Sequence, residues 1–511
     1  MATIRRAPAL TRRSVLGGIA SGAVGFAVGP GCCPKPRDRD NVVIVGAGAA
    51  GIGAALTLQQ AGRSYHLFEG SRDRIGGRAF TNMTTFGTPF DVGCAWMHAD
   101  EPDKNSMMQK VREWKDQGKW KSETFDHGMW ETHDCGRLDF NDVFYGSCGR
   151  VDRAKLQSEL SVAEHKLKEA IKQKVQQGES GDVAVGRLVT DWRWPNDVAA
   201  TAMGPMDAAV DLYNLSTADS YATGDYKQNV LVKNGYGRVI QLLARGVPSD
   251  RLFAGTCVTQ IRSSAGGVTV TTDNGSEVEA GAVIITVSTG VLAKNAIRFW
   301  DGGRDGLPDE HRQAIENLPM GLLAKIPLPV PECVHDALLK ADISDFANLL
   351  TQRSDLQNVY FLVSSYNPNL IVGFVGGDFA WSLARKVPAV PQGRQPPHEK
   401  VEKVRREALA LAKDRLADLF GCDVKGQCDA AGADNGFLTD WGWNPLTHGA
   451  YAAPTPGHFK ARETLREPAY KRIYFAGEAV ATDGWHGTCH GAYDSGCEVA
   501  NKVIAMLDKN V

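Results

Sequence analysis

A glycine-rich turn near the start of the chain has the residue types and spacing that bind a pyrophosphate. The apolar run 41–45 is followed by Gly46-Ala47-Gly48-Ala49-Ala50-Gly51, a GxGxxG pattern, and then by helical composition over 52–60. The glycines permit a tight turn, close approach of backbone N–H groups to phosphate, and close helix–strand packing. Glu69 ends a second apolar run, 65–68, where a carboxylate would bind a ribose hydroxyl. The pattern predicts a dinucleotide-binding βαβ unit rather than a glycine-rich turn without a ligand.

Four later segments indicate which dinucleotide is bound. Residues 74–78 read R-I-G-G-R, residues 474–478 read Y-F-A-G-E, and residues 491–496 read G-A-Y-D-S-G. Residues 283–292 read V-I-I-T-V-S-T-G-V-L, with Ser288 where a proline is usual. Together these segments resemble the flavin-containing amine oxidase family, which includes polyamine oxidases, monoamine oxidases and histone demethylases, over residues 41–508. NAD-dependent dehydrogenases share only the first pattern.

The resemblance implies FAD as the cofactor and no metal. It assigns cofactor contacts to a set of residues spread over the chain: Gly46, Gly48, Ala49, Ala50, Gly51, Glu69, Arg72, Gly77, Arg78, Ala95, Trp96, Val258, Gly477, Glu478, Trp485, Thr488, Cys489 and Ala492. The segment from Glu69 to Arg78 is one residue longer than is usual in the family. Monoamine oxidases bond the flavin through a cysteine just before a conserved tyrosine, and Ala450 stands there in this chain. We therefore expect non-covalent FAD.

Two residues are predicted at the reacting end of the cofactor. Lys325 lies in the segment 318–326, which resembles the part of the family that carries a flavin-adjacent lysine, and it would hold a water against the flavin. The alternative is a lysine that extends to solvent from an apolar stretch. His98 ends the segment 91–98 and matches a histidine of the amine pocket in animal polyamine oxidases. The alternative for His98 is a purely structural histidine.

An incomplete aromatic cage is predicted above the flavin. Trp441 and Tyr451 belong to a segment that resembles the W-x-x-D-P…G-x-Y stretch of the family, with Asn444 in place of the aspartate. The tyrosine forms one wall, which suits an amine that arrives as a cation. Thr488 stands where monoamine oxidases have the second tyrosine, so a bulkier or longer amine would fit. The arginine that holds a carboxylate in amino-acid oxidases is missing, which favours amines without a carboxylate.

Acidic and aromatic residues alternate in the segment 207–226. They are Asp207, Asp211, Asp219, Asp225, Tyr213, Tyr221 and Tyr226. Such a segment suits a di- or polycation, but it is also typical of a solvated loop, since charged residues are mostly exposed. Both interpretations stay open on the sequence.

The predicted fold class is α/β. A Rossmann-like FAD-binding domain would be assembled from residues 40–98, 227–298 and 436–511, and an α+β substrate-binding domain from 99–226 and 299–435. Apolar residues at intervals of three and four predict long helices over 155–177 and 401–420. Residues 251–271 and 277–287 are predicted as strands around the turn at Asp273-Asn274-Gly275.

These observations indicate an enzyme that oxidises a small amine. Hydride would pass to flavin N5 and the imine would hydrolyse, with O2 (giving hydrogen peroxide) or a redox protein as electron acceptor. The alternatives are a flavin desaturase or L-amino-acid oxidoreductase of the same fold, and a non-catalytic binding or assembly protein. A net charge of −2 excludes the basic surface that nucleic-acid binding requires. The oligomeric state is left open, with a homodimer as one option.

Residues 1–36 have the composition of an export leader. Arginine pairs, including Arg12-Arg13, precede a weakly apolar run over 17–29 that is too short to span a bilayer. Residues 11–16, T-R-R-S-V-L, resemble a twin-arginine signal, which serves proteins that are exported already folded. We expect a periplasmic or extracellular protein with no transmembrane segment. The alternatives are a disordered basic N-terminus and, less favoured, a lipid anchor at Cys32-Cys33.

The eleven cysteines show no metal-binding spacing. In an oxidising compartment Cys135 and Cys148, or Cys422 and Cys428, would be close enough in sequence for short-loop disulfides. We favour the alternative that most of the cysteines are small buried apolar residues.

Replacement of Arg12-Arg13 by two lysines tests the leader. The variant should fold and bind its cofactor but stay in the cytoplasm of a host that has twin-arginine export, because the pair itself is recognised. Cell fractionation with cofactor absorbance measures this. Export equal to that of the parent protein would contradict the prediction.

Overall fold

The structure is a computed structural model. It describes residues 40–98, 105–116, 132–134, 153–193, 195–223, 229–232, 235–329, 346–350, 358–364, 370–420 and 436–509. Contacts divide the chain into Met1–Cys32 and Cys33–Val511, and all that follows concerns the second unit. The leader, the cysteine pairs proposed for disulfides, Asp225 and Tyr226 lie outside the described residues.

A five-stranded parallel sheet forms the centre of this unit. Its order is β21-β12-β1-β2-β8, and every neighbouring pair is parallel. The strands are β1 (Val42–Val45), β2 (Tyr65–Glu69), β8 (Leu252–Ala254), β12 (Ala282–Ile285) and β21 (Ile473–Phe475). All four residues of β1 and of β12 are buried, as expected for apolar strands covered on both faces. The predicted α/β class is confirmed.

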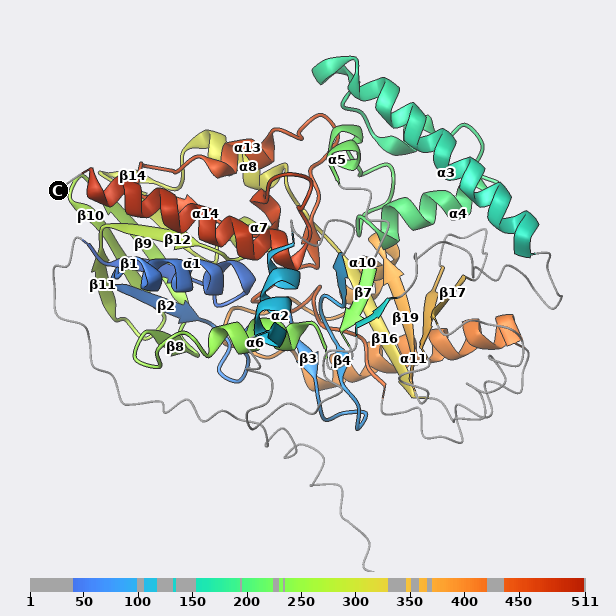
Figure 1. Cartoon of the computed structure of the whole chain (residues 1–511), viewed down its shortest axis with the longest axis horizontal. Coiled ribbons are helices and arrows are strands. Elements are labelled where there is room, and N and C mark those ends of the chain that lie inside the picture. The colour runs from blue at the N-terminus through green and yellow to red at the C-terminus, as the bar shows by residue number, and fades with distance from the viewer. Residues whose placement is uncertain are drawn as a thin grey trace, which may run out of the picture. The chain divides into compact units, whose positions relative to one another are not determined.

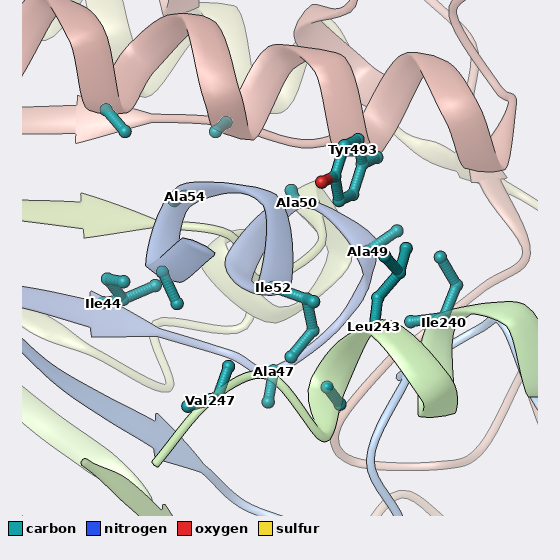
Figure 2. Packing of buried hydrophobic residues seen from close by; sticks show 14 of the residues in the cluster. Ile44, Ala47, Ala49, Ala50, Ile52, Ala54, Ile240, Leu243, Val247 and Tyr493 are labelled. Atoms are coloured by element: carbon teal, nitrogen blue, oxygen red, sulfur yellow. The ribbon is translucent and has the colours of Figure 1, made fainter. Parts of the chain in front are cut away.

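Two helices from opposite ends of the sequence pack closely against each other. Helix α1 (Ala49–Gln60) lies alongside α14 (Cys489–Asp508), as Figures 1 and 2 show. A Cβ atom on Gly496 would lie 2.0 Å from the carbonyl oxygen of Ala50, and one on Gly53 would lie 2.5 Å from that of Tyr493. The two glycines therefore allow the backbones to approach. Ile240 and Leu243 of α6 (Gly237–Ala244) lie next to the first turn of α1 (Figure 2).

A second sheet mixes antiparallel and parallel pairs. Its strands are β11 (Glu277–Ala280), β10 (Gly267–Thr272), β9 (Val258–Ser264), β13 (Arg298–Asp301) and β14 (Arg304–Asp305). The hairpin at Asp273-Asn274-Gly275 is present, with Gly275 at φ +82°. The single strand predicted over 251–271 is wrong. It is broken into β8, β9 and β10 because the chain turns at Gly255, at φ +69°, and again before Gly267.

A four-stranded antiparallel sheet forms part of a separate hydrophobic core. Its order is β16 (Leu323–Pro329), β19 (Leu370–Gly376), β18 (Tyr360–Ser364) and β17 (Phe346–Leu350). The long helix α11 (His398–Phe420) packs on this sheet through Val404, Ala408 and Leu416. Helix α3 (Arg153–Val175) is the other long helix, and both long helices were predicted to within three residues at each end.

Shorter elements complete the described part of the chain. Strand β5 (Trp96–His98) pairs with β7 (Asn229–Val232), which pairs with β6 (Thr132–Asp134). The remaining elements are β3 (Thr81–Asn82), β4 (Phe90–Asp91), β15 (Met320–Gly321), β20 (Tyr451–Ala452), α2 (Ser106–Asp116), α4 (Asn196–Thr201), α5 (Thr217–Ala222), α7 (Thr289–Ala293), α8 (Asp309–Glu316), α10 (Gly377–Ala384), α13 (Ala461–Arg466), the 3-10 turns Gly178–Gly181, Val185–Leu188 and Glu478–Val480, and a π-helical turn at Ala202–Met206.

Among the described residues, no helix is both long and apolar enough to cross a membrane. The division into a FAD-binding and a substrate-binding domain stays a prediction.

The close approach of α1 and α14 yields a stability prediction. Gly496→Ala should destabilise the protein by about 1–3 kcal/mol, because its Cβ would collide with the backbone of Ala50. Asn501→Ala, at an exposed position of the same helix, is the matched control and should have little effect. Chemical denaturation measures both. Equal stability of the two variants would contradict this packing.

Candidate active site

A cavity of about 1400 Å³ opens at the carboxyl ends of the parallel strands. Its wall includes Gly46 after β1, Glu69 at the end of β2, Thr286 after β12 and Gly477 after β21. Ligands of parallel α/β sheets bind at this edge. The volume exceeds the roughly 300–1,000 Å³ of an ordinary small-molecule site, so a large cofactor and a substrate would fit together.

Nearly all the residues predicted from the sequence line this cavity. Lys325, His98, Tyr451, Thr488 and Trp441 do so, as do most of the predicted cofactor residues. The exceptions are Gly51, Arg72 and Trp485.

The glycine-rich turn has the backbone geometry of a phosphate cradle. Gly46 has φ +102°, and a Cβ on Gly51 would lie 1.9 Å from the carbonyl oxygen of Gly46. Gly51 therefore acts in packing, as its place in the pattern predicts. Gly48 is the N-cap of α1 and offers no side chain to the first turn. The N–H groups of that turn face the cavity edge and suit an anion.

Glu69 lies beside this turn. Its carboxylate accepts hydrogen bonds from the backbone N–H of Ala47 and of Ser71, both at 2.8 Å. Burial raises the pKa of Glu69, and these backbone hydrogen bonds oppose the shift. Arg72 instead lies against Gly255. A Cβ atom on Gly255 would lie 2.5 Å from the Cγ atom of Arg72. Arg74 is the nearby arginine that reaches the cavity wall.

An ion pair joins two of the sequence motifs. Arg78 Nη1 lies 2.7 Å from Glu478 Oε1 and donates to the carbonyl oxygen of Ala450 at 2.7 Å. Glu478 also accepts from the backbone N–H of Ala452 at 3.1 Å. This pairing holds β20, which carries Tyr451, against the turn that follows β21. The sequence gives no sign of it, because the partners are 400 residues apart.

Lys325 is buried in the cavity wall, with a relative exposure of 6%. Its Nζ donates to the carbonyl oxygens of Asp91 and Gly93, both at 2.7 Å. The rings of Phe90, Trp96 and Phe374 surround it at 5.5–5.8 Å. Burial lowers the pKa of Lys325 to about 8, and the Asp91 carboxylate opposes the shift. The alternative of a lysine extending to solvent is therefore wrong.

The predicted aromatic wall is held in place by backbone acceptors. The Tyr451 hydroxyl lies 3.1 Å from the carbonyl oxygen of Met206 and 3.0 Å from that of Asp207. Trp441 Nε1 donates to the carbonyl oxygen of Val92 at 3.2 Å. Thr488 is the N-cap of α14: its hydroxyl accepts from the N–H of Gly491 and donates to the carbonyl oxygen of Trp485. Thr488 thus fixes the start of the helix as well as lining the cavity.

His98 is part of a cluster with two neighbours. Its ring stacks with that of Trp485 at 6.4 Å and meets the His490 ring edge-on at 5.8 Å. Burial, with His98 nearby, lowers the pKa of His490 to about 3, so His490 is neutral. His98 reaches the cavity and His490 does not. Trp485 therefore supports His98 from behind.

The acidic and aromatic residues of the segment 207–226 have different roles. Asp219 forms a buried ion pair with Arg462 at 2.8 Å, and Asp211 Oδ2 accepts from the N–H of Asp378 at 2.6 Å. Asp207, Asp219 and Tyr221 line the cavity, whereas Tyr213 lies outside it and stacks on Trp192. Asp211 and Asp219 therefore have structural partners, and both interpretations of the segment stay predictions.

Several cavity residues were not predicted. Glu164 lies on one face of α3, and Tyr360 lies on β18, with its buried hydroxyl close to Glu164 and Asp207. His486 lines the cavity near Asp219, and its Nε2 lies 2.7 Å from the Thr223 hydroxyl. The sequence showed only the regular spacing of apolar residues along α3, and that spacing predicts core packing.

Comparison with known proteins identifies the family. The model of the flavin containing amine oxidoreductase family matches residues 49–504. The chain belongs to this family. A lysine-specific histone demethylase 1 homolog 3 from Arabidopsis thaliana is 25% identical across 94% of this chain, which spans 31% of that protein's length. A polyamine oxidase 4 from Oryza sativa subsp. japonica is 25% identical, covering 92% of this chain and 89% of its own length.

Solved structures share the fold. Putrescine oxidase bound to putrescine superimposes with a TM-score of 0.68 at 19% identity, over 92% of this chain and 100% of that one. Cyclohexylamine oxidase from Brevibacterium oxydans IH-35A gives 0.66 at 20% identity, also over 92% and 100%. The chain therefore has the amine oxidase fold, in agreement with its family.

The cavity fits the flavin that this family uses. The uncapped first turn of α1 and Glu69 suit the adenosine and phosphate end. Gly477 has φ +138°, a conformation that favours glycine, so no side chain projects into the cavity at the end of β21. Lys325, Trp441 and Tyr451 would then surround the reacting end of the cofactor.

Lys325→Met should keep the flavin content and lower turnover by on the order of ten- to a thousandfold, because a preorganised donor is lost from a water-poor site. Both half-reactions should be followed by rapid mixing, with flavin reoxidation slowed at least as much as amine oxidation. Lys294→Met, at an exposed lysine, is the control. Parental rates in both half-reactions would contradict a role for Lys325.

Proposed function

We propose that this protein is an exported, FAD-dependent amine oxidase that acts on a polyamine or another bulky primary or secondary amine. The observation that carries the proposal is the buried Lys325 ammonium, which lies in the wall of a cavity that also contains Tyr451 and Trp441. Export rests on the leader sequence alone. Non-covalent binding rests on Ala450 in place of a flavin-linking cysteine.

FAD supplies the acceptor for a hydride from the α-carbon of the amine. The residues of the chain orient the amine, keep bulk water out and place a proton donor. Lys325 uses two of the three N–H groups of an ammonium on carbonyl oxygens, which leaves one for a water in the cavity. That water is suited to attack the imine product. The acceptor that reoxidises the cofactor is O2, with a redox protein as the alternative.

The charges around the cavity favour an amine without a carboxylate. Of the described residues in the wall, Arg74 and Arg78 are the only arginines. Arg78 is paired with Glu478, and Arg74 lies over the rings of Phe80 and Trp441, 4.9 and 5.1 Å from their centres. A substrate carboxylate would therefore meet no wall arginine that is free of both an ion pair and an aromatic stacking contact. This argues against an amino-acid oxidoreductase.

A second positive charge on the substrate would meet acidic groups. Glu164 and Asp207 line the wall near Tyr360. Burial, with Asp207 and Glu164 nearby, raises the pKa of Tyr360, so its hydroxyl stays protonated. Lys168 and Lys172 follow along the same face of α3. The wall also contains Glu69, Glu169, Asp219 and Glu478, of which Asp219 and Glu478 are paired with arginines. A diamine or polyamine suits this arrangement.

Anaerobic mixing with a panel of amines tests the proposed function. Putrescine and spermidine should bleach the flavin absorbance faster than hexylamine or benzylamine, and L-leucine should leave it unchanged. Failure of every amine to reduce the flavin would contradict the proposal, and reduction by L-leucine alone would favour an amino-acid oxidase. Admitting O2 and assaying hydrogen peroxide then separates O2 from a redox-protein acceptor.

The double variant Glu164→Gln/Asp207→Asn tests whether these two acidic groups bind a second positive charge on the substrate. It should slow reduction by putrescine more than reduction by hexylamine, because only the diamine carries a second cation. Asp197→Asn is matched to it, since Asp197 lies near Tyr360 but does not line the cavity.

A further inference from the structure

His486 lies beside the aromatic wall of the cavity, in the turn that leads into α14. The next residue, Gly487, packs on the ring of Tyr451: a Cβ atom on Gly487 would lie 3.6 Å from the Cδ2 atom of that ring. All three residues line the cavity, although His486 is only 8% exposed. A polar ring is therefore held close to the place where the substrate amine is expected to meet Tyr451.

Hydrogen bonds fix the tautomer of the His486 ring. Its Nε2 lies 2.7 Å from the Thr223 hydroxyl, and that hydroxyl donates its only hydrogen to the carbonyl oxygen of Asp219 at 2.9 Å. The hydroxyl must therefore accept from His486, so Nε2 carries a hydrogen. The Asp219 carboxylate, 3.5 Å from Nε2, favours the same tautomer. The lone pair is then on Nδ1, which has no partner among the described residues and is not sealed from solvent as Nε2 of His490 is.

The surroundings of the ring keep it neutral. Burial lowers the pKa of His486 to about 4; Asp219 and Glu478 oppose the shift, and Arg462 and Arg466 add to it. At neutral pH the imidazole is therefore uncharged, and its Nδ1 accepts a hydrogen bond but cannot donate one. An N–H group is the part of an amine that suits this atom.

We infer that His486 Nδ1 accepts a hydrogen bond from the substrate nitrogen, and that this contact selects amines that keep an N–H in their neutral, reactive form. Such amines are primary or secondary, because a tertiary amine has no N–H once it has lost its proton. The inference rests on the proposed amine oxidation, in which the nitrogen lone pair must stay free to form the imine bond. A hydrogen bond through N–H orients the amine without engaging that lone pair. His486 is thus a specificity-determining residue, and Asp219 and Thr223 hold it in the required tautomer.

Two isomeric amines test this contact on the flavin-loaded protein. N-ethylhexylamine is secondary and N,N-dimethylhexylamine is tertiary, but they have the same molecular formula and the same hexyl chain. Anaerobic rapid mixing gives, for each amine, the rate constant of flavin reduction divided by Kd. The protein should prefer the secondary amine, because a buried acceptor is left without a donor when the tertiary amine binds. Equal values for the two isomers would overturn the inference without the need for a variant.

Two substitutions separate this contact from a purely structural role of His486. His486→Gln keeps an N–H for Thr223 but loses the acceptor at Nδ1, whereas His486→Asn places an amide oxygen near Nδ1 and loses the contact with Thr223. His486→Gln should reduce the preference for the secondary amine by about two- to tenfold, the effect of one hydrogen bond, and His486→Asn should keep it. His458→Gln, at an exposed histidine outside the cavity, is the matched control and should leave the preference unchanged.

The outcomes distinguish this inference from the proposed function. Failure of both isomers and of putrescine to reduce the flavin would contradict amine oxidation itself. A preference that His486→Gln leaves unchanged, or that both substitutions abolish together, would overturn the acceptor role of His486 while amine oxidation stands. Loss of bound flavin in both variants would show that His486 is structural and would overturn the inference as well.

Discussion

A buried positive charge is the constraint on which the site depends. An ammonium group removed from water is costly unless polar groups replace its hydration. Lys325 meets this requirement with two carbonyl oxygens, and three aromatic rings lie around it. Both carbonyls belong to the segment that leads into β5, while the lysine belongs to a different sheet. The same contacts that compensate the charge therefore fix one wall of the cavity.

The segment held by Lys325 is also anchored from its other side. The Asp91 carboxylate accepts from the backbone N–H groups of Tyr236 and Gly237, at the start of α6, and from the hydroxyl of Thr81. Burial raises the pKa of Asp91 to about 6, and nearby Lys325 opposes the shift. Because the pKa of Lys325 is about 8, both groups are mainly charged at neutral pH. Their attraction then adds to the backbone contacts.

Two other ion pairs stabilise the part of the cavity wall that carries Tyr451. Arg78 and Glu478 hold the strand that carries Tyr451, and the buried pair Asp219–Arg462 ties α5 to α13. Arg462 also donates to the carbonyl oxygens of Ala452 and Ala479. The aromatic wall, the turn after β21 and α5 are therefore held as one polar network, which suits a cavity that must keep its form when a cofactor and a substrate bind.

The sequence predicted what depends on local pattern. The β-branched run before Gly46 indicated a buried parallel strand, and the periodicity of the two long helices gave their positions. It missed the breaks at Gly255 and before Gly267, although the glycines at 255 and at 266–267 are residues that commonly mark turns. The partners of Asp219 and Glu478 could not be predicted, because each lies hundreds of residues away and a contact at that distance leaves no periodic signal. The cap role of Thr488 was predictable, since threonine before a helix commonly serves as N-cap.

A crystal structure of the flavin-loaded protein at a resolution that shows ordered water is the most direct test of this account. We predict flavin in the described cavity, with the Lys325 ammonium on the carbonyl oxygens of Asp91 and Gly93 and its remaining N–H on a water that faces the cofactor. A flavin bound elsewhere, or a Lys325 side chain turned away to solvent, would contradict the central role given to this lysine.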